Sequence, residues 1–127
     1  MNQSLNKIEK LKSAKEISLI FQEGKSISAF PVRMFYRKAQ FLNTDSPIIK
    51  AAFSVSKKNF KKAVDRNRIK RLLRENYRKN KYIACNNTTS HQYAIIFLYT
   101  GKEMPDHNLI ENKIKKLLSS FMERELN

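Results

Sequence analysis

The chain has 127 residues, and its 26 Lys and Arg residues outnumber 11 Asp and Glu residues to give a formal net charge of +15 at pH 7. This length can bury one core but not two, so we expect a single domain over residues 1–127. The positive charge indicates a polyanionic partner such as nucleic acid. The single Cys85 excludes an internal disulfide, and the two glycines are too few for a Gly-rich phosphate-binding loop.

The sequence shows no pattern typical of membrane insertion or export. No stretch approaches the ~20 consecutive apolar residues that cross a bilayer. Residues 1–10 are polar and lack the apolar segment of a signal peptide. A lone cysteine suits a reducing compartment. We therefore expect a cytoplasmic protein with no membrane partner.

A helix is predicted after a basic N-terminal arm of about residues 1–12. Ser13 and Glu16 have the spacing of a capping box, in which each side chain bonds the backbone N–H of the other. Phe21 lies on the apolar side of this helix, and Gly24 is predicted to end it as a C-cap.

Two strands are predicted next. Residues 27–39 are aromatic and β-branched, with Pro31 placing their first part on an edge or a bend. Residues 43–47 are typical of a turn. The second strand covers residues 48–56, where apolar side chains alternate with small ones.

The most informative segment runs from Lys57 to Lys81, with twelve Lys and Arg residues against only Asp65 and Glu75. Helical periodicity over about residues 62–80 gathers an apolar stripe for the core, made of Ile69, Leu72, Leu73 and Tyr77. The opposite face is polar and cationic, with Asn67, Lys70, Arg71, Arg74 and Arg78. Arg66 and Arg68 lie on its two borders. The face is predicted to bind RNA phosphates.

The alternative interpretation is a helix face that is merely solvated. Such faces usually mix charges to gain pairs four residues apart, as Glu75 could with Arg71 or Lys79. This face carries almost no acid, and its self-repulsion favours a polyanionic partner.

The C-terminal third predicts a strand and a helix. Residues 93–100 form the strand, and Gly101 to Pro105 interrupt regular structure. Asn108 and Glu111 could cap the last helix, whose core stripe is Ile110, Ile114, Leu117, Leu118 and Phe121. The order helix, strand, strand, helix, strand, helix predicts an α+β fold, a two-layer α/β sandwich with helices packed on one face of the sheet.

No side chains suggest a protein active site or a metal site. His91 lies in a polar loop, and His107 lies near a helix start. Asp65 and Glu75 lie among arginines as charge partners. We therefore expect no catalytic residue and no tightly bound metal in the protein.

The segment FSVSKKNFKKAVDRNRIKRLLRENYR resembles the signature of the bacterial ribonuclease P protein component. The likeness includes Ser54 to Lys58, the stretch Lys62-Ala63-Val64, and an R-N-R-x-K-R-x-x-R core beginning at Arg66. It extends to the L-K-S-x-x-E-I-x-x-x-F-x-x-G opening from Leu11 to Gly24 and to the chain length, so it covers nearly the whole chain.

This resemblance implies a protein that binds a catalytic RNA and helps it remove the 5′ leader of precursor tRNA. In the family the RNA performs the chemistry with Mg²⁺ held by its phosphates, and the strand–helix–strand crossover is left-handed. The residues that the resemblance and the basic segment together assign to RNA binding are Lys57, Lys58, Lys61, Lys62, Arg66, Asn67, Arg68, Lys70, Arg71, Arg74 and Arg78.

The resemblance also implies a leader-binding cleft between the first helix and the sheet. It assigns Phe21 and Phe35 to this cleft, and Arg33 joins them because residues two apart on a strand point to the same side. Lys57 and Lys58 could meet phosphates at its rim. The alternative for Phe21 is a plain core contact with Ile17, four residues away.

Two other functions remain open from the sequence. A basic helix can also read DNA in the major groove, but such helices usually belong to small helical domains, so no DNA partner is expected. A ribosomal or RNA-chaperone protein is the closer alternative. It would bind RNA without stimulating tRNA processing.

Overall fold

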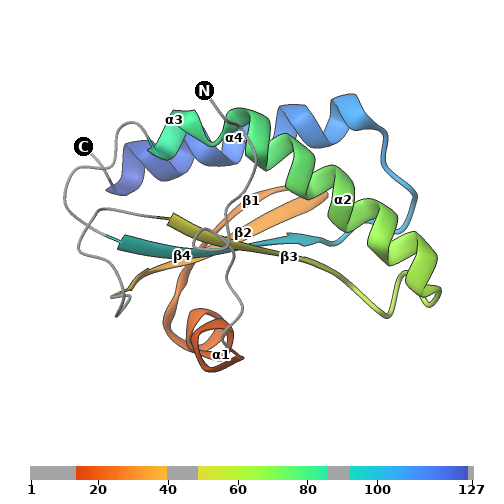
Figure 1. The fold of residues 1–127 in the computed structure, drawn as a ribbon, viewed down its shortest axis with the longest axis horizontal. Coiled ribbons are helices and arrows are strands. Elements are labelled where there is room, and N and C mark those ends of the chain that lie inside the picture. The colour runs from red at the N-terminus through yellow and green to blue at the C-terminus, as the bar shows by residue number, and fades with distance from the viewer. Residues whose placement is uncertain (1–13, 40–48, 86–91, 126–127) are drawn as a thin grey trace.

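A four-stranded sheet lies between helices on both of its faces (Figure 1). The computed structural model describes residues 14–39, 49–85 and 92–125. Its elements are α1 (Ala14–Glu23), β1 (Lys25–Ala29), β2 (Val32–Ala39), β3 (Ile49–Val55), α2 (Ala63–Asn80), α3 (Tyr82–Cys85), β4 (Gln92–Tyr99) and α4 (His107–Glu125). This confirms the predicted α+β class.

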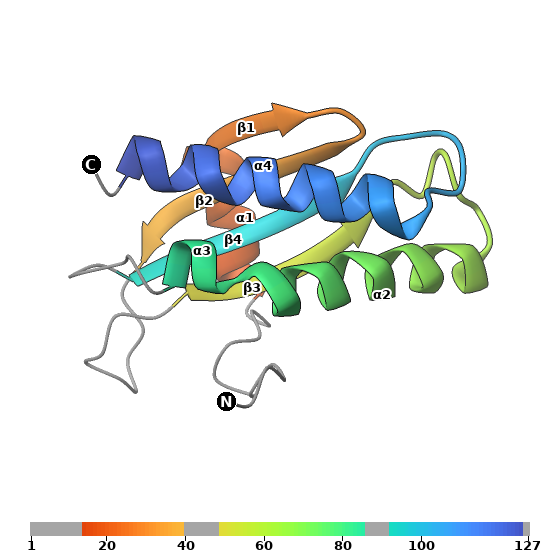
Figure 2. The same cartoon turned by 90° about the horizontal axis from the view of Figure 1, so that it is seen from above.

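The strands lie in the order β1-β2-β4-β3. β1 and β2 form an antiparallel hairpin, and β2 pairs antiparallel with β4. β3 pairs with β4 in parallel, with Ala51 opposite Ile95 and Val55 opposite Tyr99. The chain must therefore cross over between β3 and β4, and α2 makes this crossing above the sheet. Figure 2 views the sheet from the α2 side, with β3 and β4 pointing to the right and β4 above β3. When this view is turned so that both strands point upward, β4 lies to the left of β3. The crossover therefore has the left-handed sense found in only ~2% of such units.

Two apolar clusters lie on opposite faces of the sheet. The larger one lies under α2 and α4, where Ile69, Leu73 and Tyr77 and the whole predicted stripe of α4 are buried. The smaller one is formed by Ile20 of α1 with Ala94 and Ile96 of β4. The prediction that all helices share one face is therefore wrong for α1, which lies below the sheet in Figure 1. Its short apolar side is enough to cover only part of that face.

The strand predicted over residues 27–39 is in fact a hairpin. β1 and β2 are joined by a turn at Phe30 and Pro31, whose peptide bond is cis. Pro31 has no N–H to donate to a ladder, so the pattern that predicted a bend in one strand marks the turn between two. The sheet consequently has four strands where the sequence predicted three.

Helix ends also differ from the predictions. The Oδ1 of Asp106 accepts a hydrogen bond from the N–H of Leu109 at 2.8 Å, so Asp106 caps α4 in place of Asn108. Gly24 does follow α1, but without a positive φ. A Cβ there would collide with the carbonyl oxygens of Ile20 and Tyr36, so close backbone approach requires the glycine.

Several predictions fall outside the described residues. These are the N-terminal arm, the Ser13 half of the capping box, the turn at residues 43–47, His91 and the side chain of Cys85.

A carboxylate ties the end of α4 to the sheet. Glu125 accepts hydrogen bonds from the hydroxyls of Tyr36 at 3.1 Å and Tyr93 at 3.5 Å, and it pairs with Lys25 at 3.4 Å. Burial, the hydrogen bond to Glu125 and the negative charge of Glu125 together raise the pKa of Tyr36 to about 12. Ionising Tyr36 would place two negative charges together.

This raised pKa predicts alkaline sensitivity. The neutral Tyr36 hydroxyl stabilises the folded state fully below pH 10, and this stabilisation is lost as the pH rises through about 12. Tyr36→Phe should flatten the fall in unfolding free energy over this range by up to about 3 kcal/mol, because the pKa shift from 10 to about 12 corresponds to about 1.4 kcal/mol per pKa unit. Urea unfolding at a series of pH values measures this. Tyr82→Phe, at an exposed ring, is the control, and the same alkaline dependence in both variants would contradict the assignment.

Candidate nucleic-acid interface

The outer side of α2 presents a row of basic side chains. Packing of Ile69, Leu73 and Tyr77 into the larger cluster fixes which side of the helix faces outward. Asn67, Arg68, Arg71 and Arg74 are exposed there, and Lys70 and Arg78 are half-buried. We call these six residues the basic face of α2. The structure thus brings the predicted residues together on one surface.

Arg66 has a contact that the helical pattern did not predict. Its Nη1 donates hydrogen bonds to the carbonyl oxygens of Phe60 at 2.9 Å and Lys61 at 2.8 Å. These bonds hold the segment before α2 against the first turn of the helix. Arg66 therefore lies next to the basic face and also positions the loop before α2.

The loop before α2 carries four exposed lysines. They are Lys57, Lys58, Lys61 and Lys62. Asn59 anchors this loop to the end of β4, because its Nδ2 donates to the carbonyl oxygens of Thr100 and Gly101, both at 3.2 Å. The lysines extend the cationic surface of α2 along a fixed loop.

The two acids of α2 do little to neutralise this surface. Asp65 lies in the first turn, where a negative charge suits the helix dipole. Glu75 pairs with Arg71 at 3.1 Å, but the Arg71 side chain is 75% exposed. Exposed pairs of this kind are worth less than about 1 kcal/mol, so a phosphate can replace Glu75 as the partner of Arg71.

A second group of predicted residues meets on the opposite face of the sheet. The rings of Phe21 and Phe35 lie edge to face with centroids 5.0 Å apart, and the Arg33 guanidinium carbon lies 5.1 Å from the Phe35 centroid. Phe21 is 49% exposed, which is more than a plain core contact with Ile17 would leave. We call Phe21, Arg33 and Phe35 the aromatic cluster. It brings an exposed aromatic ring, a half-buried aromatic ring and an exposed cation together.

Arg37 is a site residue that the sequence analysis missed. It pairs with Glu16 at 2.7 Å and Glu23 at 3.7 Å, and so fastens both ends of α1 to β2. The signal was present, since Arg33, Phe35 and Arg37 alternate on one side of the strand. Arg37 therefore fixes the position of Phe21 over the sheet.

The described residues contain no group of three His, Cys, Asp or Glu side chains that could hold a metal ion. Within the same residues, no helix has the length and apolarity needed to span a membrane.

Comparison with known proteins identifies the family. A family model described as Ribonuclease P matches residues 5–122. The ribonuclease P protein component of Porphyromonas gingivalis is 38% identical over 118 residues, which cover 90% of this chain and 83% of that protein. That of Chlorobium phaeobacteroides is 33% identical, with 97% of this chain and 91% of that protein covered. The chain belongs to the Ribonuclease P family and is a protein subunit of that endoribonuclease.

Solved structures show the same fold. The RNase P protein from Thermotoga maritima matches with a TM-score of 0.68 and 27% identity, covering 88% of this chain and 96% of that one. The RNase P protein from Staphylococcus aureus matches with a TM-score of 0.69 at 22% identity, covering 94% and 98%. The arrangement of α2 and α1 on opposite faces therefore belongs to a recurring architecture.

Charge reversal on the basic face should weaken RNA binding. Arg68→Glu is expected to lower affinity for a ribonuclease P RNA by about tenfold or more, and to reduce the slope of log affinity against log salt by about 1, because a phosphate contact is lost. Filter binding over a salt series measures both quantities. The matched control is Lys116→Glu, the same charge change at an exposed position of α4. Equal losses in the two variants would mean that only net charge matters.

Proposed function

We propose that this protein binds the catalytic RNA of ribonuclease P through the basic face of α2 and the lysines of the preceding loop. We propose further that it holds the 5′ leader of precursor tRNA at the aromatic cluster. Together with the RNA it would assist removal of the leader and so generate the mature tRNA 5′ end. The cytoplasm is the compartment in which we place this reaction.

The single observation that carries this proposal is the placement of two different surfaces on opposite faces of one sheet. A duplex or folded RNA presents phosphates, which suit the exposed arginines of α2. A single strand presents unpaired bases, which suit the exposed ring of Phe21 and the half-buried ring of Phe35 with Arg33 beside it. One protein could therefore contact both RNAs at once.

Mg²⁺ enters this proposal through the RNA. We propose that the required Mg²⁺ is held at sites formed mainly by RNA phosphates, whose oxygens suit this cation. Besides binding both RNAs, the protein would contribute electrostatically. Its +15 charge would offset repulsion between the catalytic RNA and its substrate.

The proposal is tested by precursor-tRNA cleavage at low Mg²⁺, with a bacterial ribonuclease P RNA in the presence and absence of this protein. Correctly positioned cleavage, scored by the size of the leader product, should increase when the protein is added. The protein alone should give no product. Tight binding of a cognate RNA without any stimulation would instead support a ribosomal or chaperone role.

The aromatic cluster gives a prediction about substrate choice. Phe21→Ala should weaken binding of precursor tRNA to the holoenzyme by about fivefold or more, since stacking of one base on an aromatic ring is worth roughly 1–3 kcal/mol. Mature tRNA has no leader, so its affinity should not change. Phe21→Trp should restore precursor binding. Equal losses of affinity for the two tRNAs would instead indicate that Phe21 has a structural role.

A further inference from the structure

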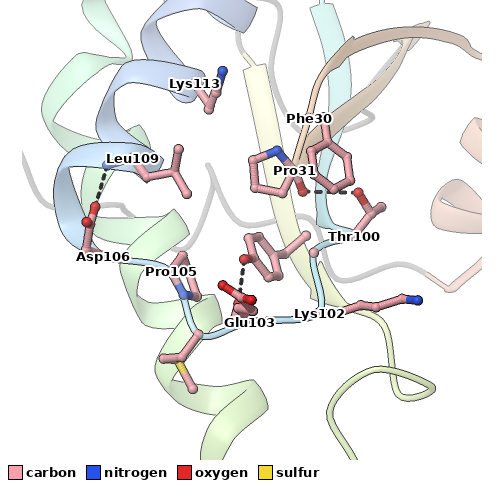
Figure 3. Close-up of a pocket in the computed structure, with 12 residues that line it drawn as sticks. Phe30, Pro31, Thr100, Lys102, Glu103, Pro105, Asp106, Leu109 and Lys113 are labelled. Carbon is pink, nitrogen blue, oxygen red and sulfur yellow. Dashed lines mark hydrogen bonds between the residues drawn. The ribbon is translucent and has the colours of Figure 1, made fainter.

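A pocket of about 680 Å³ lies at the end of the sheet where the hairpin turn, the loop after β4 and the first turns of α4 meet (Figure 3). It is separate from the basic face of α2 and from the aromatic cluster. Pro31, Tyr99 and Pro105 are buried in its walls, and Leu109 adds an aliphatic side. Phe30 lies at its rim and is 71% exposed, so its ring is accessible to a ligand.

The walls of this pocket are held in place by hydrogen bonds. Thr100 donates to the carbonyl oxygen of Pro31 through its N–H at 2.8 Å and through its hydroxyl at 3.1 Å. The hydroxyl of Tyr99 donates to the carbonyl oxygen of Glu103 at 2.6 Å. Gly101 is required at this point, since a Cβ would collide with the side chains of Tyr99 and Pro31. The pocket is therefore formed before any ligand arrives.

The charges around the pocket indicate the chemistry of its ligand. Lys113 lies at one side, and Lys102 extends outward from the loop (Figure 3). Glu103 and Asp106 balance them, and the Asp106 carboxylate is already bonded to the N–H of Leu109. An anion would need an excess of donors, which is absent from this lining. A nucleobase is uncharged and flat, and it carries donors and acceptors along its edge, so it matches apolar walls with mixed polar groups.

The position of the pocket indicates which RNA supplies that base. Leu109 and Lys113 belong to α4, so the pocket lies on the side of the sheet that carries α2. Asn59 joins its loop to the lysine-bearing loop before α2 through the carbonyl oxygens of Thr100 and Gly101. Both loops lie at the same end of the molecule (Figure 2). A nucleotide in the pocket could therefore belong to the same RNA that binds along α2. It could not readily belong to an RNA strand at the aromatic cluster, which lies on the other face of the sheet.

We propose that this pocket binds one unpaired base of the catalytic RNA, stacked against Phe30 with its edge toward Glu103 and Lys113. The inference rests on the proposed function of α2 and adds a base-binding site to it. The phosphates that flank the base would meet the lysines of the loop before α2.

The test uses the full chain and a ribonuclease P RNA, with two readouts. The first is the dissociation constant of the complex, and the second is chemical modification of unpaired bases along the RNA. Phe30→Ala should weaken binding by about tenfold and remove protection from one unpaired nucleotide, because a stacked base is lost. Phe30→Trp should restore both. Circular dichroism should show unchanged folding, as expected for an exposed side chain.

A matched pair on α4 separates the pocket from net charge. Lys113→Ala and Lys116→Ala each remove one positive charge, but only Lys113 lines the pocket. Lys113→Ala should weaken binding more than Lys116→Ala does, and it should alter protection of the same nucleotide.

Three results would overturn the inference. The first is that Phe30→Ala leaves RNA affinity and nucleotide protection unchanged while Arg68→Glu still weakens RNA binding. This would show that the pocket binds no base, and it would leave the proposed function of α2 intact. A rise in KM for precursor tRNA without a change in affinity for the catalytic RNA would assign the base to the substrate. If Arg68→Glu and Phe30→Ala both leave binding unchanged, the proposed function fails together with the inference.

Discussion

The parallel pairing of β3 with β4 is the constraint on which the rest of the structure depends. Parallel neighbours cannot be joined by a tight turn, so the chain must return along one face of the sheet. α2 makes that return, and burial of Ile69, Leu73 and Tyr77 fixes its rotation about its own axis. The arginines on the opposite side are then held outward together. A surface with this much like charge persists because the apolar stripe stabilises the helix independently of any partner.

The same sheet separates two kinds of chemistry. On the α2 side the exposed groups are cations on a rigid helix, which suit phosphates. On the α1 side the exposed groups include the Phe21 ring and Arg33, and Arg37 holds α1 in place through two carboxylates. Because β4 contributes Ile95 and Phe97 to one cluster and Ala94 and Ile96 to the other, the two surfaces share a common support. Their separation is fixed by the thickness of the sheet.

Periodicity in the sequence was sufficient to predict the elements with strong patterns. The stripes of α2 and α4 and the alternation of β3 follow from local spacing, and the structure confirms them. The hairpin was missed because Phe30 and Pro31 interrupt one long β-prone run without a typical turn sequence. The side of the sheet taken by α1 could not be predicted either, since Ile17 and Ile20 would suit either face. The left-handed crossover came only from the resemblance.

The candidate site was predictable where it depends on one helix and not where it depends on tertiary contacts. Spacing alone gathered Arg68, Arg71 and Arg74. It could not reveal that Arg66 donates hydrogen bonds to the carbonyl oxygens of Phe60 and Lys61, or that Phe30 lines the same pocket as Leu109, which is far away in the chain. Pockets of this kind depend on loops meeting in space, for which a single sequence gives no signal.

We propose that opposite faces of the sheet contact different RNAs. This proposal is tested most directly by placing a photo-crosslinking amino acid at Val64, which is 77% exposed at the start of α2, or at Phe21 on α1, and mapping the crosslinks in the assembled holoenzyme with precursor tRNA. Position 64 should crosslink to the catalytic RNA, and position 21 should crosslink to leader nucleotides. Crosslinks from position 64 to the leader, or from both positions to the same RNA segment, would contradict it.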